Sequence, residues 1–111
     1  MSIKVQTIHH FNEIDFDRPG KSLYEVAFHY DGTWGNAMVP LAVINGEAGP
    51  GRAVACFGGA HGNEHEGQIA LWRLLHEIDP AEMHGRLLIM PRLNQPACVA
   101  VTRPSPLDGV N

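Results

Sequence analysis

One stretch of the sequence decides the fold: Ala53-Val54-Ala55-Cys56-Phe57-Gly58-Gly59-Ala60-His61-Gly62-Asn63-Glu64-His65-Glu66-Gly67. Its first five residues are apolar on both faces, which predicts a central strand of a sheet. A glycine-rich turn follows, and apolar residues then recur at helical spacing, at Leu71, Leu74, Leu75 and Ile78. We expect Asn63 to cap a helix that ends at Asp79-Pro80, with Glu64 and Glu66 in its first turn.

The flanking segments predict strands on both sides of this unit. Residues 87–90 form a second apolar run, so strand, helix and strand make a right-handed βαβ crossover with parallel strands. Residues 23–30 alternate as a half-buried strand, and together with the mostly apolar residues 38–45 they predict an antiparallel hairpin. Residues 45–52 are rich in glycine and predict a break. The fold class is therefore α/β, a mixed sheet with an N-terminal antiparallel hairpin and a βαβ unit.

We expect residues 1–111 to form the N-terminal part of a single domain. A central strand that is apolar on both faces needs helices on both sides, and the sequence contains only one good helix. Residues 102–111 show turn chemistry and no terminal element that would dock them. A sheet cut in this way exposes a strand edge and an uncovered face, so we expect a homo-oligomer.

The composition argues against nucleic-acid and membrane partners. The net charge is -4, and Lys and Arg do not cluster. No apolar run approaches the roughly 18 residues that cross a bilayer, and the N-terminus lacks the apolar segment of a signal peptide. Cys56 and Cys98 lie far apart in apolar settings, so we expect free thiols and a cytoplasmic location.

His61 and Glu64 are the candidate metal ligands. They follow the carboxyl end of a predicted strand, where open α/β sheets place their ligands. A neutral imidazole and a carboxylate three residues apart can both bind one zinc ion. The plain alternative is that Glu64 belongs to a helix cap and that His61 is a surface loop histidine. From the residues alone, both interpretations stay open.

The other histidines show no ligand spacing. Adjacent residues of a strand point to opposite faces, so His9 and His10 cannot easily share one ion. His65 and Glu66 project from the first helical turn in directions that differ from that of Glu64, and we interpret them as helix-surface residues. The remaining histidines, which we expect to be solvated or locally hydrogen-bonded, are His29, His76 and His84.

Two motifs carry a family resemblance. The first is the run from Gly58 to Gly67 quoted above, which follows an apolar strand. The second is Arg92-Leu93-Asn94-Gln95-Pro96, followed by Thr102-Arg103 and by Ser105-Pro106-Leu107-Asp108-Gly109-Val110-Asn111. Together they resemble the succinylglutamate desuccinylase/aspartoacylase family, relatives of the zinc carboxypeptidases. The last phrase is similar in particular to the branch that deacetylates N-acetyl-diaminobutyrate during ectoine breakdown.

The resemblance implies a zinc-dependent hydrolase that cleaves the amide bond of a small N-acyl amino acid. It implies His61 and Glu64 as two of three zinc ligands, within the N-terminal portion of a zinc carboxypeptidase-like fold. Arg103 matches the arginine that polarises the scissile carbonyl and binds the substrate. The third ligand, the asparagine-arginine pair and the general-base glutamate have no counterpart here, so we expect this chain alone to be inactive or nearly so.

Two other classes of function stay open. One is a zinc carboxypeptidase that acts on peptides, which a substrate panel separates from a deacylase. The other is a non-enzymatic module that only folds, associates or scaffolds. Metal analysis of the chain and of a His61→Ala variant tests the non-enzymatic class. A module without a metal site carries equally little zinc in the unmodified chain and in the variant.

Overall fold

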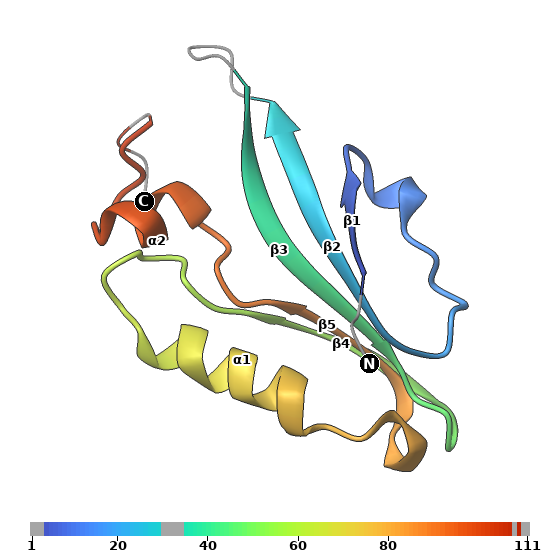
Figure 1. The fold of residues 1–111 in the computed structure, drawn as a ribbon. Helices are drawn as coiled ribbons and strands as arrows, with labels where there is room; N and C mark the ends of the chain where they lie inside the picture. Colours follow the sequence, from blue (N-terminus) through green and yellow to red (C-terminus); the bar gives the residue numbers. More distant parts are fainter. Residues whose placement is uncertain (1–3, 30–34, 108, 110–111) are drawn as a thin grey trace.

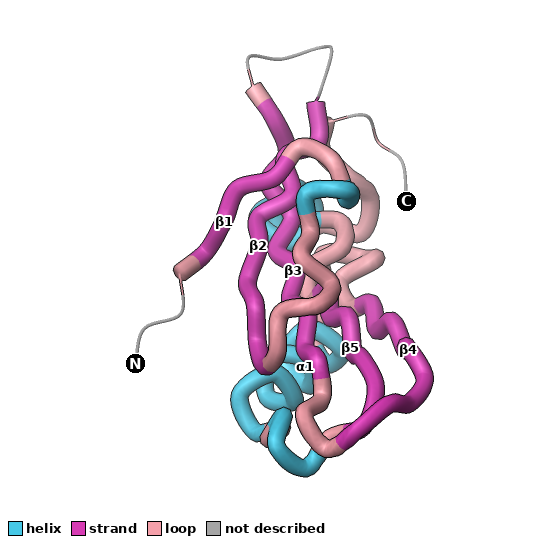
Figure 2. Tube along the Cα trace, turned by 90° about the vertical axis from the view of Figure 1, so that its right-hand side faces the viewer, coloured by secondary structure: helices cyan, strands magenta, loops and turns pink. Residues whose placement is uncertain are grey.

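The computed structural model describes residues 4–29, 35–107 and 109. Its centre is a five-stranded mixed sheet with the order β1-β2-β3-β5-β4, which Figure 2 shows across the molecule. The predicted strands all form, and β1 is an additional strand that pairs in parallel with β2. The strands are β1 (Val5–Ile8), β2 (Gly20–His29), β3 (Asn36–Asn45), β4 (Gly49–Phe57) and β5 (His84–Met90).

The predicted hairpin and the predicted crossover both form. β2 and β3 pair antiparallel along their whole length, from Gly20 opposite Asn45 to His29 opposite Asn36. β4 and β5 pair in parallel and are joined through helix α1 (Glu66–Glu77), which makes the βαβ unit. β5 also pairs antiparallel with β3, so the two units form one sheet. The α/β fold class with a mixed sheet is confirmed.

The sheet has an apolar core on each face. The apolar side of α1 packs on one face, where Leu75 is buried with Ala42, Ile44 and Ile89; Figure 1 shows the helix lying along β4 and β5. The other face is covered by the segment that follows β1, which includes the short 3-10 helix η1 (Phe11–Glu13) and from which Ile14 and Phe16 pack on the sheet. The buried residues of that second cluster are Ile8, Ile14, Tyr24, Val26, Val39, Leu41, Val43 and Met90. Alternating residues of β3 serve both clusters, as the twofold period of a strand requires.

β4 is not the central strand that its apolar sequence predicted. It lies at the edge of the sheet, and within the described residues only β5 pairs with it. Val54 and Phe57 are 52% and 59% exposed. The reason is that α1 packs on a cluster built by β3 and β5, to which β4 contributes no buried residue. The predicted break is also shorter, because β4 already begins at Gly49.

A second helix, α2 (Gln95–Ala100), was not predicted. Asn94 is its N-cap, Pro96 lies in its first turn, and Val101 ends it in the left-handed conformation with φ 56°. An asparagine followed by proline is a helix-start signal, but a helix of six residues is too short to show an apolar period. In Figure 1, α2 lies beyond the carboxyl ends of β4 and β5, next to the loop that follows β4.

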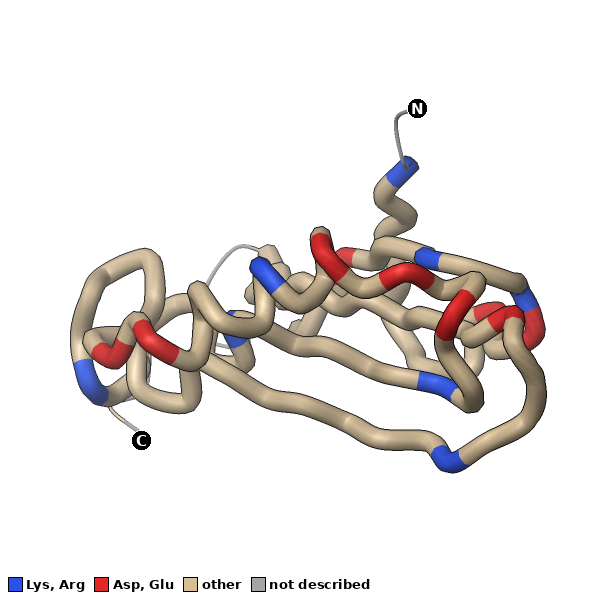
Figure 3. Tube along the Cα trace, turned by 90° about the horizontal axis from the view of Figure 1, so that it is seen from below, with Lys and Arg blue, Asp and Glu red and all other residues tan. Residues whose placement is uncertain are grey.

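The remaining predictions concern surfaces and location. Cys56 and Cys98 are both free, and the cytoplasmic location stays a prediction. No helix of the described ranges is long and apolar enough to cross a membrane. Lys and Arg residues lie singly along the chain (Figure 3). The strand end at Tyr30 and the tail residues Asp108, Val110 and Asn111 lie outside the described residues.

Candidate metal centre

The loop of residues 58–65, called the metal loop below, joins β4 to α1 (Figure 1). It leaves the sheet in a sharp turn in which Gly59 has φ +69°, a conformation that side chains other than glycine rarely adopt. The N–H of Gly58 donates to the carbonyl of Met90 (2.9 Å), so the start of the loop stays tied to the end of β5. The loop is therefore anchored where two parallel strands end, as the sequence predicted.

His61 and Glu64 meet in this loop. The His61 Nδ1 and Glu64 Oε2 atoms are 2.9 Å apart, and the two side chains are 26% and 59% exposed. In a tetrahedral site, two ligand atoms at about 2.0–2.2 Å from one zinc ion lie roughly 3.3–3.6 Å from each other. The 2.9 Å distance is that of a hydrogen bond between the two side chains. Both donor types suit zinc, and a shift of about half an ångström would bring the two atoms to the spacing of two ligands in a site that is open to solvent.

The helix start differs from the prediction. α1 begins at Glu66 with His65 as its N-cap, and Asn63 lies before the helix and is exposed. The reason lies in the turn, where the N–H of Glu64 donates to the carbonyl of His61 (3.3 Å) instead of continuing into the helix. His65 and Glu66 are exposed at the helix start, so they are surface residues as predicted.

The metal loop rests on the segment that follows β5. The N–H groups of Leu93 and Asn94 donate to the carbonyls of Gly58 (2.8 Å) and Gly59 (3.0 Å). A Cβ at Gly62 would lie 2.0 Å from the carbonyl oxygen of Ala97 in α2. Only glycine fits at position 62, because the loop backbone touches the helix backbone there.

Arg103 lies in the segment that leaves α2 and is exposed. The N–H of Thr102 donates to the carbonyl of Ala97 (3.0 Å), the same oxygen that packs against Gly62. Arg103 therefore sits at the same end of the molecule as the metal loop. Within the described residues, no ion pair or hydrogen bond joins Arg103 to His61 or Glu64.

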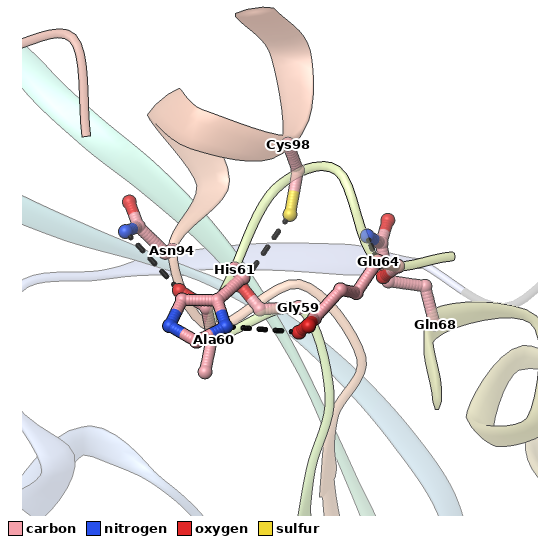
Figure 4. Close-up of polar contacts among 7 residues, drawn as sticks. All are labelled: Gly59, Ala60, His61, Glu64, Gln68, Asn94 and Cys98. Atoms are coloured by element: carbon pink, nitrogen blue, oxygen red, sulfur yellow. Dashed lines mark hydrogen bonds and ion pairs between the residues drawn. The ribbon is translucent and has the colours of Figure 1, made fainter. Parts of the chain in front are cut away.

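Three residues that contact the metal loop were not identified as functional from the sequence. Gln68 Nε2 donates to the carbonyl of Glu64 (2.9 Å), and Asn94 Nδ2 donates to that of Ala60 (3.4 Å). The buried thiol of Cys98 donates to the carbonyl of Gly59 (3.5 Å). Figure 4 shows these side chains around the His61–Glu64 pair. Only Asn94 carried a local signal, its position before a proline, because contacts across the fold leave no periodic trace in a sequence.

No third ligand accompanies the pair in the described part of the chain. Nowhere in residues 4–29, 35–107 and 109 do three His, Cys, Asp or Glu side chains come close enough together to hold one ion. The described chain therefore offers one imidazole and one carboxylate at this site.

Comparisons with known proteins agree on one family. Residues 50–111 match the model of the Succinylglutamate desuccinylase/Aspartoacylase catalytic domain, so the match includes the metal loop and Arg103. The N-alpha-acetyl-L-2,4-diaminobutyric acid deacetylase of Halomonas elongata is 40% identical over 81 residues, which are 73% of this chain and 23% of that protein.

Solved structures of similar proteins share the fold. The succinylglutamate desuccinylase/aspartoacylase of Rhodobacter sphaeroides aligns with a TM-score of 0.76 and 38% identity, over 87% of this chain and 30% of that one. The product-bound ectoine utilization protein EutE (DoeB) of Ruegeria pomeroyi aligns with a TM-score of 0.75 and 36% identity, over 89% of this chain and 31% of that one. The chain thus spans less than a third of the length of these relatives.

Proposed function

Because this chain belongs to the succinylglutamate desuccinylase/aspartoacylase family, we propose that it carries part of the active site of a zinc-dependent deacylase. The observation that supports this most directly is the 2.9 Å approach of His61 Nδ1 and Glu64 Oε2 in a loop inside the matched region. In this proposal the two side chains hold zinc, and the reaction is hydrolysis of the amide bond of an N-acyl amino acid.

Each residue has a defined role in the proposed chemistry. His61 and Glu64 would hold the zinc ion, which would supply Lewis acidity toward water and the scissile carbonyl. His61 contributes a neutral imidazole and Glu64 a negative charge, so the pair offsets half of the charge of the ion. The guanidinium of Arg103, exposed at the same end of the molecule, binds the substrate and shares the negative charge that develops on the carbonyl oxygen.

The substrate we propose is an N-acetylated diamino acid of the diaminobutyrate type. Two relatives support it: a deacetylase of N-alpha-acetyl-L-2,4-diaminobutyric acid and an ectoine utilization protein that was solved with product bound. The same names favour a small acylated amino acid over a peptide, which is the substrate of the carboxypeptidase alternative.

We propose that the 111-residue chain by itself binds zinc weakly and turns over little substrate. Its described residues offer two ligands to the ion, and each missing ligand removes both a bond and part of the preorganisation of the site. Metal analysis of the chain after zinc loading tests this: we expect less than one bound ion per chain in mild buffer, and none after His61→Ala. Equal zinc in the two proteins contradicts the metal site.

A chimera tests the reaction. The matching 81-residue segment of the Halomonas deacetylase is replaced by the corresponding residues of this chain, and acetate release from N-acetyl-diaminobutyrate is measured. We expect turnover that disappears with His61→Ala and falls strongly with Arg103→Ala. A folded, zinc-loaded chimera that releases no acetate contradicts the deacetylase proposal, and one that cleaves peptides instead supports the carboxypeptidase alternative.

We also propose that the 111-residue chain self-associates. The outer edge of β4 has no partner strand in the described ranges, and Phe11, Phe28 and Phe57 line one apolar hollow while 50%, 43% and 59% exposed. A second copy that pairs with this edge covers both features. Sedimentation should show dimers or larger species that shift to monomer in Phe57→Lys; a monomer at high concentration contradicts the proposal.

A further inference from the structure

Two side-chain amides hold the metal loop from opposite ends. Gln68, in the first turns of α1, donates to the carbonyl of Glu64 (2.9 Å). Asn94, at the start of α2, donates to the carbonyl of Ala60 (3.4 Å), the residue before His61. Figure 4 shows the two amides on either side of the His61–Glu64 pair. Each proposed ligand is thus held through its own or its neighbour's main chain.

Gln68 replaces a missing helical bond. The first helical hydrogen bond of α1 runs from the N–H of Ile69 to the carbonyl of His65 (3.0 Å), so the carbonyl of Glu64 lies outside the helical ladder. The Gln68 side chain satisfies that carbonyl and is itself 7% exposed. A buried side chain has one rotamer fixed by packing, so Gln68 fixes the main chain of Glu64 against α1.

Asn94 joins the loop to α2. Its main-chain N–H donates to the carbonyl of Gly59 (3.0 Å) and its side-chain N–H to that of Ala60. Its Oδ1 accepts from the N–H of Ala97 (3.4 Å) and so caps α2. One residue therefore sets the distance between the backbone before His61 and the helix that leads to Arg103.

We propose that Gln68 and Asn94 are positioning residues of the proposed metal centre, which keep the His61 and Glu64 donor atoms next to each other before any ion binds. This inference rests on the proposed function. The two ligand side chains are partly solvent-exposed, so neighbouring side chains restrict them little. The two amides fix the main chain from which they project, which lowers the ordering cost of binding a metal.

The test is zinc affinity of the 111-residue chain, measured by NMR from the shift of the His61 imidazole resonances on titration with zinc chloride. Gln68→Met keeps length and packing but removes the donor; Asn94→Ser keeps an N-cap oxygen but is too short to reach Ala60. We expect each variant to bind zinc roughly two- to tenfold more weakly, the range that corresponds to one lost hydrogen bond.

Leu75→Met is the matched control. It changes a buried residue of the same helix, 6% exposed and packed against the sheet instead of the metal loop, and a volume-conserving change there perturbs stability only modestly. We expect its zinc affinity to equal that of the unmodified chain. Circular dichroism confirms that each variant is folded at the temperature of the titration, and if one amide variant unfolds, the other decides alone.

The outcomes separate the two proposals. If zinc does not move the His61 resonances of the unmodified chain, the metal centre itself is wrong. If zinc binds to the unmodified chain and equally well to a folded Gln68→Met or Asn94→Ser variant, the metal centre stands and the positioning roles are overturned. If Leu75→Met weakens zinc binding as much as the amide variants do, the positioning roles are also overturned. Any loosening of α1 would then lower the zinc affinity.

Discussion

Two glycines of the same motif should respond oppositely to alanine. At Gly62 an added Cβ lies 2.0 Å from the carbonyl oxygen and 2.1 Å from the carbonyl carbon of Ala97. At Gly67, inside α1, the nearest atom to an added Cβ is the Cα of Gly58 at 3.8 Å, an ordinary contact. Neither glycine has a positive φ. Comparing Gly62→Ala with Gly67→Ala therefore isolates the effect of a steric clash with a neighbouring backbone, because neither position has a strained φ.

The expected magnitudes follow from these distances. Real Cβ contacts below 3.0 Å essentially do not occur, so Gly62→Ala must move the metal loop and α2 apart by about 1 Å. Overpacking of this kind costs about 1–3 kcal/mol. With an unfolding entropy of about 2.1 cal/mol/K per residue, this lowers Tm by about 4–13 °C in a chain of this length. Gly67→Ala should raise stability by about 0.5–1 kcal/mol, because alanine favours the helix.

Thermal unfolding followed by circular dichroism measures both changes, and zinc titration gives the functional effect. We expect Gly62→Ala to lower both the Tm and the zinc affinity, because the displaced loop carries His61 and Glu64. Gly67→Ala should keep its zinc affinity. A Gly62→Ala chain as stable as the unmodified one refutes the packing of the loop on α2. A Gly67→Ala chain that is destabilised as much as Gly62→Ala contradicts close backbone approach as the cause of the loss.

Three further predictions concern the scaffold. Leu75→Ala removes a buried side chain of the α1 core and should cost about 2–5 kcal/mol in urea unfolding; a loss below about 1 kcal/mol contradicts the packing. Arg86 Nε donates to Asn45 Oδ1 (2.8 Å) and Nη2 to the carbonyl of Phe16 (2.7 Å), so Arg86→Lys should cost about 1–3 kcal/mol, which unchanged stability would disprove. Hydrogen bonds from the N–H of His10, and then from that of His9, lower the pKa of Glu13 below its ordinary value. Its contribution to stability is therefore complete above the unfolded-state pKa and is lost as the pH falls through the folded-state pKa; carbon NMR titration showing an ordinary or raised pKa contradicts this.

The sequence predicted the elements whose patterns are local. The apolar side of α1 repeats at helical spacing, and its members pack on the sheet. Strand alternation in β2 and the two apolar runs of the crossover gave the hairpin and the parallel pair. These patterns survive in the fold because each element buries the side that its own residues define.

The features that the sequence did not reveal depend on pairing between distant segments. The apolar residues of β4 predicted a central strand, but its place in the sheet depends on which strands pair with it, and pairing leaves no trace in composition. α2 is too short for a period, and the helix start moved to Glu66 because the turn at His61 takes the N–H of Glu64. The roles of Gln68 and Asn94 are contacts across the fold.

The position of the metal loop explains why an exposed edge strand can carry a defined site. β4 contributes little buried surface, so burial of that strand cannot fix the loop that follows it. The loop is fixed instead by backbone bonds to the segment after β5, at Gly58 and Gly59, and by contact between Gly62 and α2. Those contacts use no side chain of the loop, so the His61 and Glu64 side chains pair with each other instead of holding the loop in place. Glycine at these positions therefore allows the backbone contacts that place His61 and Glu64. Loss of one such contact should displace both proposed ligands at once.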